Sequence, residues 1–352
     1  MKKQLGLFDL TMICVSFVIG MGIFRAPVNV AKATPDVLTY FLCWLAGGIV
    51  AFCGALTYAE IGSRIPATGG YYKVFSYAYH PSIAFAINCI ILVSNAASLA
   101  MVALVGSEYL SGVLFPASDK IKTIELSFAI IAIIIFYGVN MLGLKLSSRT
   151  QNILMIIKIG MVLLLIVSVL LAPAAPVIEP ETTTTALTDY IKAFGIGLVA
   201  VSFTYGGYQQ TINFGDEVKD PLRTVPRSIF WGIFIIVSLY LLVNYAYVRV
   251  IGFEQLKDSK NIAAIMASKV LGTKAENILS VLLFLGVLGY INGSLLSNPR
   301  VMYAMSNDKV LPALFSKTNK NGVLTSSLTI FSLIAVLVVF WAEEFDKILS
   351  FS

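Results

Sequence analysis

Nine long apolar stretches run through the sequence, and they constrain the fold more than any other feature. A helix needs about 20 apolar residues to cross the hydrocarbon core of a bilayer. Segments of about ten alternating residues, which a membrane barrel requires, are not found. The sequence therefore predicts an all-α integral membrane protein with nine helical spans. These spans are 7–27, 37–62, 82–112, 124–143, 149–172, 191–214, 226–251, 276–306 and 323–342.

The composition agrees with a lipid environment and excludes several functions. Of the 352 residues, 58% are hydrophobic and 12% are charged, whereas soluble domains carry about 25% charged residues. His80 is the one histidine, and all four cysteines lie inside apolar stretches. We therefore expect no disulfide framework, no metal site and no cofactor. The sequence also shows no nucleophile–base pair and no phosphate-binding loop, so we predict a protein that is not an enzyme.

Charges near the spans predict how the chain lies in the membrane. Lys2 and Lys3 precede the first stretch, but Asp9 interrupts it and no small-residue cleavage site follows, which disfavours a signal peptide. Lysine and arginine are slightly more frequent in the loops on the N-terminal side, which favours a cytoplasmic N-terminus. We expect a multi-pass protein of the cytoplasmic membrane, with the lipid bilayer around it and no nucleic-acid partner. The sequence identifies no protein partner.

A polar segment divides the chain into two blocks of spans. Residues 172–189 contain several prolines and four consecutive threonines. We predict a first repeat of five spans over 1–172, an outer loop over 173–190, and an incomplete second repeat of four spans over 191–352. Because the first block has an odd number of spans, a repeat that follows it must be inverted in the membrane.

The opening span of each block contains glycines near its middle. Glycine permits the non-helical dihedral angles of an unwound segment, and broken helices at matching places in two halves indicate a transporter site. Glycine pairs also allow helices to pack closely, which is the alternative explanation. The first segment reads Val18-Ile19-Gly20-Met21-Gly22-Ile23-Phe24, and the second reads Phe203-Thr204-Tyr205-Gly206-Gly207-Tyr208-Gln209-Gln210.

The helix ends at these two breaks offer complementary chemical groups. Backbone N–H groups that begin a new half-helix suit a carboxylate, because they lie at the positive end of the helix dipole. Carbonyl groups that end the preceding half-helix suit an ammonium. Together they predict a site for an α-amino acid zwitterion. The predicted substrate-binding residues are Val18, Ile19, Met21, Gly22, Ile23, Phe203, Thr204, Gly206 and Gln209.

Several motifs, spread over the whole chain, resemble those of amino acid permeases of the amino acid–polyamine–organocation (APC) superfamily. The similarity is greatest to the L-type, sodium-independent branch, with a departure at Met21, where a small residue is usual. The motifs are Gly20-Met21-Gly22-Ile23-Phe24, Tyr58-Ala59-Glu60-Ile61-Gly62 with Gly69-Gly70-Tyr71-Tyr72, Phe203 to Tyr208, Glu217-Val218-Lys219-Asp220-Pro221, and Asn292-Gly293-Ser294 with Pro299-Arg300.

This resemblance implies a secondary active transporter that moves amino acids by alternating access. It also implies a five-plus-five inverted-repeat fold with broken helices 1 and 6, usually followed by two further helices. The sequence stops after nine spans, so we expect a chain truncated before helix 10, a helix that lines the substrate cavity in the family. Within this family an exchanger and a proton-linked carrier both remain open.

Lys158 lies in the middle of an apolar span, about 15 Å from either end of its helix. A lysine at the bilayer centre costs roughly 2.5–3.5 kcal/mol on insertion scales, so it indicates a function. A structural lysine that bridges helix carbonyls is the alternative. The resemblance implies that its ammonium takes the place of a sodium ion between the helix 1 break and helix 8, where Ser294 would be its second partner. A proton-coupling role is also open.

Other polar residues are weaker candidates. Ser94, Asn95, Tyr208, Gln210 and Tyr290 would line a side-chain pocket or form helix–helix hydrogen bonds. Arg25 would attract an acidic substrate or pair with a carboxylate, and Glu108 is similarly ambiguous. We expect Glu60, Asp216 and Glu217 to hold an inner gate closed.

Two other functions are alternatives to amino acid transport. A polyamine or organic-cation transporter of the same fold would need several acidic residues in mid-span, and none is convincing in this sequence. A channel would show repeated pore-lining motifs, whereas a structural membrane protein would not need the two breaks.

Overall fold

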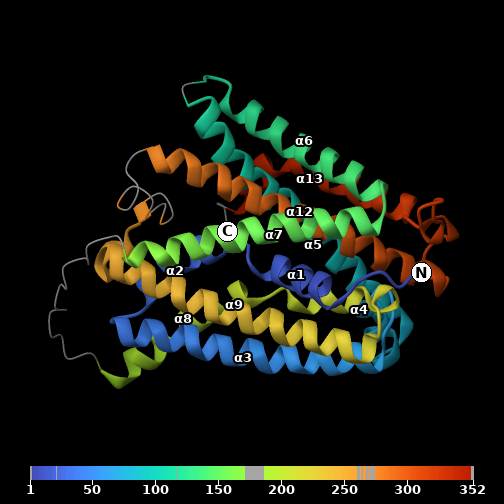
Figure 1. The fold of residues 1–352 in the computed structure, drawn as a ribbon, viewed down its shortest axis with the longest axis horizontal. Helices are drawn as coiled ribbons and strands as arrows, with labels where there is room; N and C mark the ends of the chain where they lie inside the picture. The colour runs from blue at the N-terminus through green and yellow to red at the C-terminus, as the bar shows by residue number, and fades with distance from the viewer. Residues whose placement is uncertain are drawn as a thin grey trace.

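The computed structural model describes residues 2–20, 22–116, 118–170, 186–259, 262, 265–266, 269 and 274–349. Extended pairing among these residues is limited to two isolated bridges, Leu5 with Val218 and Thr68 with Phe214. The rest of the regular structure is helical (Figure 1). The helices are α1 (Leu7–Val18), α2 (Gly22–Ala33), α3 (Val37–Arg64), α4 (Gly70–Ala78), α5 (Pro81–Leu114), α6 (Ile121–Met141), α7 (Leu144–Val167), η1 (Ser168–Leu170), α8 (Leu187–Tyr205), η2 (Tyr208–Asn213), η3 (Gly215–Glu217), α9 (Pro221–Ile251), α10 (Phe253–Lys257), α12 (Lys274–Asn307), η4 (Ala313–Ser316) and α13 (Thr325–Leu349).

The predicted spans correspond to these helices. In the described part of the chain, seven helices are long and apolar enough to cross a membrane, and the pair α1 and α2 together makes an eighth. The ninth predicted stretch is helical as well, although its apolar part, Thr325–Trp341, is shorter than the others. The prediction of an all-α membrane protein with a broken first span is therefore confirmed.

The helices pack in two groups. In the first group, α9 contacts α3 and α1, and α8 contacts α3 and α2. In the second group, α5 contacts α12, α13 and α6, and α13 also contacts α6. In Figure 1, α3, α8 and α9 lie below α7, whereas α6, α12 and α13 lie above it. Each group has its own buried apolar core.

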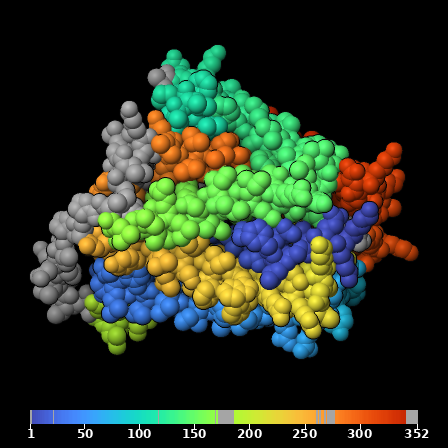
Figure 2. Space-filling model, in the orientation of Figure 1, coloured from blue at the N-terminus to red at the C-terminus, as the bar shows by residue number. Residues whose placement is uncertain are grey.

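Helix α7 joins the two groups. It contacts α12 of the second group, and α1 and α9 of the first. Met161, Val162 and Leu165 belong to the first core, whereas Leu154 and Met155 belong to the second. Figure 2 shows α1 in dark blue at the surface between α7 in light green and α9 in yellow to orange. A side chain at the middle of α7 therefore lies where the two groups meet.

The boundary of the predicted outer loop differs from the structure. Helix α7 ends at Val167, η1 follows it, and α8 begins at Leu187, so the last residues assigned to the loop are helical. Asp189 lies in the first turn of α8, where a carboxylate is stabilised by the helix dipole. Residues 173–185 of the predicted loop lie outside the described residues.

Candidate functional site

The first span breaks between α1 and α2. Helix α1 ends at Val18, and the next residue, Ile19, leaves the helical region with φ −72° and ψ 87°. Helix α2 begins at Gly22, so its first N–H groups, including that of Ile23, have no partner within the helix. Met21, which was predicted to contribute an N–H group, lies outside the described residues. The break predicted at these glycines is confirmed.

Side chains from other helices occupy the carbonyls that end α1. The Tyr240 hydroxyl of α9 donates to the Val18 carbonyl at 2.9 Å, and the Gly20 N–H donates to the same oxygen at 2.8 Å. Because a carbonyl oxygen has two lone pairs, the Val18 carbonyl has none left for a substrate in this arrangement. Its contact with a substrate ammonium stays a prediction, and it would require one of these bonds to open.

Lys158 reaches the same break from α7. Its side chain is buried, and Nζ donates to the Ile19 carbonyl at 2.5 Å. On α12, a Cβ at Gly286 would lie 3.0 Å from Lys158 Cε, so this glycine leaves room for the lysine stem. The ammonium thus connects α7 to the end of the first half-helix, which is the contact that the family resemblance implies. Among the described residues, Lys158 is the donor to the Ile19 carbonyl, and a second lone pair of that oxygen has no donor there.

Ser294 lies elsewhere on α12. It is buried, and both its carbonyl and its hydroxyl accept hydrogen bonds from the Asn298 amide, at 2.9 and 3.1 Å. The described hydrogen bonds link Lys158 to Ile19 and not to Ser294, which follows Gly286 on α12 by about two helical turns. Ser294 as the second partner of the ammonium therefore stays a prediction.

The sixth span breaks at two consecutive glycines. Helix α8 ends at Tyr205, Gly206 is extended with φ −68° and ψ 156°, and Gly207 has φ 122°. A residue with a side chain rarely adopts the Gly207 conformation. The Gln209 side chain accepts from the Gly207 N–H at 2.9 Å, so this break is closed by a local contact. The last carbonyls of α8, including that of Thr204, have no partner within the helix.

The two breaks touch one another. A Cβ at Gly22 would lie 3.1 Å from Thr204 Cγ2, and a Cβ at Gly207 would lie 2.4 Å from the Phe17 carbonyl oxygen. The Tyr240 hydroxyl also lies 3.5 Å from the Thr204 carbonyl, so one side chain of α9 faces both breaks. The structure thus brings together the positive end of α2 and the negative end of α8, the two groups that recognition of a zwitterion requires.

A cavity borders each break. A small one lies beside the first break and is lined by Gly20, Phe24, Val102, Lys158, Gly286 and Tyr290, among others. Another of about 560 Å³ lies beside the second break, between α3 and the residues Ser202, Gly206, Tyr208 and Gln209. Tyr290 and Tyr208, which were predicted as pocket residues, therefore line cavities. Whether they contact a substrate stays a prediction.

Other predicted pocket residues have structural contacts. Asn95 donates to Asn298 at 2.7 Å, and Gln210 accepts from Asn213 and Ser297, both at 3.1 Å. For Asn95 and Gln210, the sequence allowed either a place in the side-chain pocket or hydrogen bonds between helices, and these contacts are of the second kind. Ser94 is exposed on α5. The side chain of Phe203 is 84% exposed, so of this residue the backbone carbonyl alone remains a candidate for the site.

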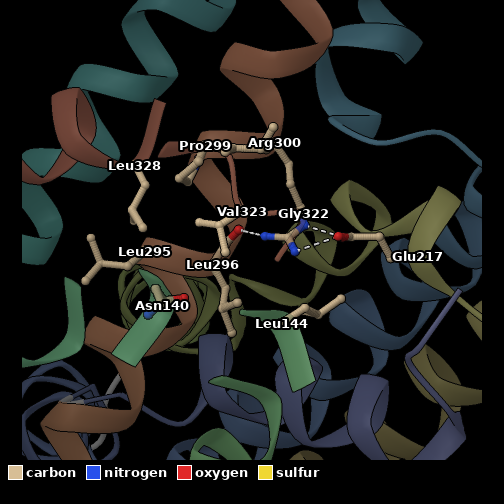
Figure 3. Close-up of a pocket in the computed structure, with 11 residues that line it drawn as sticks. Asn140, Leu144, Glu217, Leu295, Leu296, Pro299, Arg300, Gly322, Val323 and Leu328 are labelled. Atoms are coloured by element: carbon tan, nitrogen blue, oxygen red, sulfur yellow. Dashed lines mark hydrogen bonds and ion pairs between the residues drawn. The ribbon is translucent and has the colours of Figure 1, made fainter. Parts of the chain in front are cut away.

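A buried ion pair lies close to the N-terminal segment. Arg300 of α12 donates through Nε and Nη2 to the Glu217 carboxylate, and through Nη1 to the Leu296 carbonyl (Figure 3). The Glu217 carbonyl also accepts from Gln4 and Leu5 of the N-terminal segment, at 2.8 and 2.9 Å. Glu217, Arg300 and Leu296 also line a small cavity. Glu217 thus joins the N-terminal segment to α12, and its role in an inner gate stays a prediction.

The remaining charged candidates are less central. Asp216 accepts from the Thr68 N–H at 2.9 Å, whereas Glu60 pairs with Arg64 on the exposed face of α3. Arg25 and Glu108 are both exposed. Their suggested roles stay predictions.

Sequence reasoning missed two parts of this site. Tyr240 was not singled out, although a tyrosine in an apolar span needs a hydrogen-bond partner for its hydroxyl when it is buried. The pairing of Glu217 with Arg300 was not foreseen either. Glu217 and Arg300 each lie in one of the motifs given above, but nothing in their spacing along the sequence indicates that they form an ion pair.

Helices that break in mid-membrane, with opposite helix ends facing one another, define a class of protein, the secondary transporters. The sequence matches the profile of the family described as amino acid permease over residues 5–352. The chain belongs to that family, whose members are transporters and not enzymes, and it is a multi-pass membrane protein.

Curated relatives agree with this family. The chain is 28% identical to the serine/threonine exchanger SteT of Bacillus subtilis, over 89% of this chain and 70% of that protein. It is 27% identical to the large neutral amino acids transporter small subunit 2 of Mus musculus, over 100% of this chain and 67% of that protein. It is also 28% identical to the b(0,+)-type amino acid transporter 1 of Mus musculus, over 96% of this chain and 70% of that protein.

Proposed function

We propose that this protein carries α-amino acids across the cytoplasmic membrane without sodium, by alternating access, as an exchanger or a proton-linked carrier. One observation carries the proposal: the Lys158 ammonium lies on the Ile19 carbonyl at the first break. A cation that bridges the end of a broken helix to a neighbouring helix is what a bound sodium ion would otherwise supply. The relatives named above support the substrate class, and one of them is named as an exchanger.

In this proposal the substrate binds as a zwitterion between the two breaks. Its carboxylate would accept from the first N–H groups of α2, at Gly22 and Ile23. Its ammonium would donate to carbonyls at the end of α8, those of Phe203, Thr204 and Gly206, and to the remaining lone pair of Ile19. Contacts to the backbone suit every α-amino acid equally, so the side-chain pocket would select among them.

The proposal also includes the arrangement in the membrane. The N-terminus would face the cytoplasm, and the blocks 1–172 and 191–352 would be inverted repeats around the site. The Glu217–Arg300 pair, which lies near the N-terminal segment, would then close the cytoplasmic side.

A transporter of polyamines or other organic cations is less well supported. Such a substrate needs unpaired carboxylates near the breaks. Glu217 is the buried acidic residue among those described, and Arg300 already neutralises it.

Counterflow in proteoliposomes tests this function. Vesicles that contain the purified protein with a tenth helix supplied, and that are loaded with unlabelled serine, threonine or leucine, are expected to accumulate the labelled amino acid equally well in sodium and choline buffers. The Gly22→Val variant is expected to lose amino acid binding while remaining folded, because its side chain would meet Thr204 at the substrate position. Strictly sodium-dependent uptake, or unchanged binding by Gly22→Val, would contradict the proposal.

A further inference from the structure

A cluster of buried amides connects α7 to α12 and α6. The Asn292 amide of α12 donates to the Gln151 side-chain oxygen of α7 at 2.6 Å and to the Ser147 carbonyl at 3.1 Å. Gln151 donates to the Gly289 carbonyl at 3.1 Å, and Asn140 of α6 donates to Asn292 at 2.9 Å. All three amide side chains are at most 5% exposed. We call Asn140, Gln151 and Asn292 the amide cluster.

The amide cluster lies on the same face of α7 as Lys158. Gln151 precedes the lysine by seven residues, which is two helical turns or about 10.5 Å. Between them, Met155 packs against Gly289, where a Cβ would lie 2.2 Å from the methionine Cε. Lys158 itself passes Gly286. The face of α7 that carries the lysine thus packs closely against glycines of α12.

The hydrogen bonds of the amide cluster constrain the register of α7 against α12. Sliding by one turn, about 5.4 Å, would separate Gln151 from both Asn292 and Gly289 and leave buried amides without partners, which is costly in a membrane interior. The same slide would carry the Lys158 ammonium away from the Ile19 carbonyl. The same register of α7 against α12 therefore allows the hydrogen bonds of the amide cluster and places the Lys158 ammonium at the Ile19 carbonyl.

We propose that Gln151 and Asn292 are positioning residues for transport, which set the register of α7 against α12 so that Lys158 reaches the Ile19 carbonyl. This role rests on the proposed function of Lys158. It concerns residues that touch neither a break nor a cavity beside one, and it makes the amide cluster part of the transport machinery.

A double-mutant cycle with Lys158 tests this role. Gln151→Met keeps the volume of the side chain and removes its hydrogen bonds, and we expect it to slow amino acid counterflow about tenfold. Residues about 10.5 Å apart normally have additive effects. If Gln151 acts through the lysine, the Gln151→Met/Lys158→Ala double variant is expected to be no slower than Lys158→Ala alone. Additive losses would overturn the proposal.

Exchange of the two amides provides a rescue experiment. The Gln151→Asn/Asn292→Gln double variant keeps one long and one short amide across the same gap, and it is expected to recover most of the counterflow that either single variant loses. The matched control is Asn88→Leu, because Asn88 is a buried amide that donates within its own helix, to the Ala84 carbonyl. This control is expected to transport normally. No recovery by the swapped pair would contradict the positioning role.

A cross-link reports the register without any transport measurement. A Cβ at Gly289 would lie 3.6 Å from Leu154 Cβ, a separation at which a disulfide forms. In a background without the four native cysteines, the Leu154→Cys/Gly289→Cys pair is expected to cross-link readily, and added Gln151→Met is expected to reduce the yield several-fold. An unchanged yield would overturn the proposal. If Gln151→Met reduces the cross-linking yield but the protein shows no counterflow, the amide cluster sets the register and the proposed transport function is wrong.

Discussion

The two breaks differ in what holds them. The carbonyls at the end of α1 accept from side chains of two other helices, Tyr240 of α9 and Lys158 of α7. At the break after α8, a side chain of the same segment caps the backbone, because Gln209 accepts from the Gly207 N–H, and Gly207 packs against the Phe17 carbonyl of α1. The polar partners of the first break are therefore side chains of α7 and α9, whereas the polar cap of Gly207 comes from its own segment.

This difference indicates how each break responds when the protein moves. A shift between the two helix groups pulls directly on the bond between Lys158 and Ile19, since α7 contacts both groups. The bond between Gln209 and Gly207 stays within one segment and does not stretch. We therefore expect substitutions around the first break to change the transport rate, and substitutions around the second to change stability or apparent affinity.

Removing the lysine is expected to have the largest effect. Lys158→Ala leaves the Ile19 carbonyl without its charged donor, and a hydrogen bond to a charged group contributes about 1.5–3 kcal/mol. Counterflow should fall roughly 10- to 150-fold. Lys158→Arg should rescue poorly, because the planar guanidinium is larger than the space beside Gly286 allows. Rates in proteoliposomes measure both effects.

The control for this prediction lies on the same helix. Lys145 is an exposed lysine near the start of α7, so Lys145→Ala removes an equal charge without touching either break. It should transport like the unmodified protein. A Lys158→Ala variant with normal counterflow would show that the first break does not depend on α7.

The glycine pair of the second break gives the next largest effect. Gly207→Ala forces a side chain into φ 122° and against the Phe17 carbonyl, so we expect it to destabilise the protein by about 1–3 kcal/mol. Gly206→Ala has an ordinary φ, and its Cβ would lie no closer than 3.6 Å to the atoms around it. It should be nearly neutral. Thermal unfolding in detergent distinguishes the two, and equal melting temperatures would contradict this account.

Tyr240 tests whether one side chain links the breaks. Tyr240→Phe removes the hydroxyl but keeps the ring, and since the Gly20 N–H still donates to the Val18 carbonyl, we expect a loss of about 1 kcal/mol. Counterflow should fall several-fold. Tyr245→Phe is the matched control, because Tyr245 lies on the same helix with its side chain 52% exposed. A loss of the same size in both variants would mean that the bond to Val18 has no special role.

The fold could be predicted from the sequence to a large extent, because the bilayer sets both the length and the polarity of a span. The breaks were also predictable, since Gly20, Gly22, Gly206 and Gly207 interrupt runs that are otherwise helical. Lys158 was found because a charge in an apolar helix is conspicuous. These features are local in sequence, and local features need no knowledge of the tertiary structure.

The partners of these groups could not be predicted in the same way. The sequence indicated that the Val18 carbonyl would be free for a substrate, but Tyr240, more than 200 positions later, donates to it. Ser294 as a partner of Lys158 stays a prediction, whereas Gly286 is a residue of α12 that lies beside the lysine stem. Which groups meet across two helices depends on the register between them, and the register depends on packing and hydrogen bonds between residues far apart in sequence. A single sequence does not reveal that register.

Substitution of Gln209 is expected to have the smallest effect on stability and transport. It tests directly how the second break differs from the first. Its side chain lines the 560 Å³ cavity, accepts a hydrogen bond from the Gly207 N–H and also meets the Tyr71 hydroxyl. Gln209→Met should change stability by no more than about 0.5 kcal/mol, as for other partly exposed positions. If Gln209 contacts the substrate, KM should rise a few-fold while kcat is unchanged, because the contact is equal in the bound and transition states.

Gln210→Met is the neighbouring comparison. The hydrogen bonds of Gln210 to Asn213 and Ser297 are structural, so this variant should have a lower melting temperature and an unchanged KM. The opposite pattern, with KM changed by Gln210→Met and not by Gln209→Met, would place the substrate on the other side of the second break.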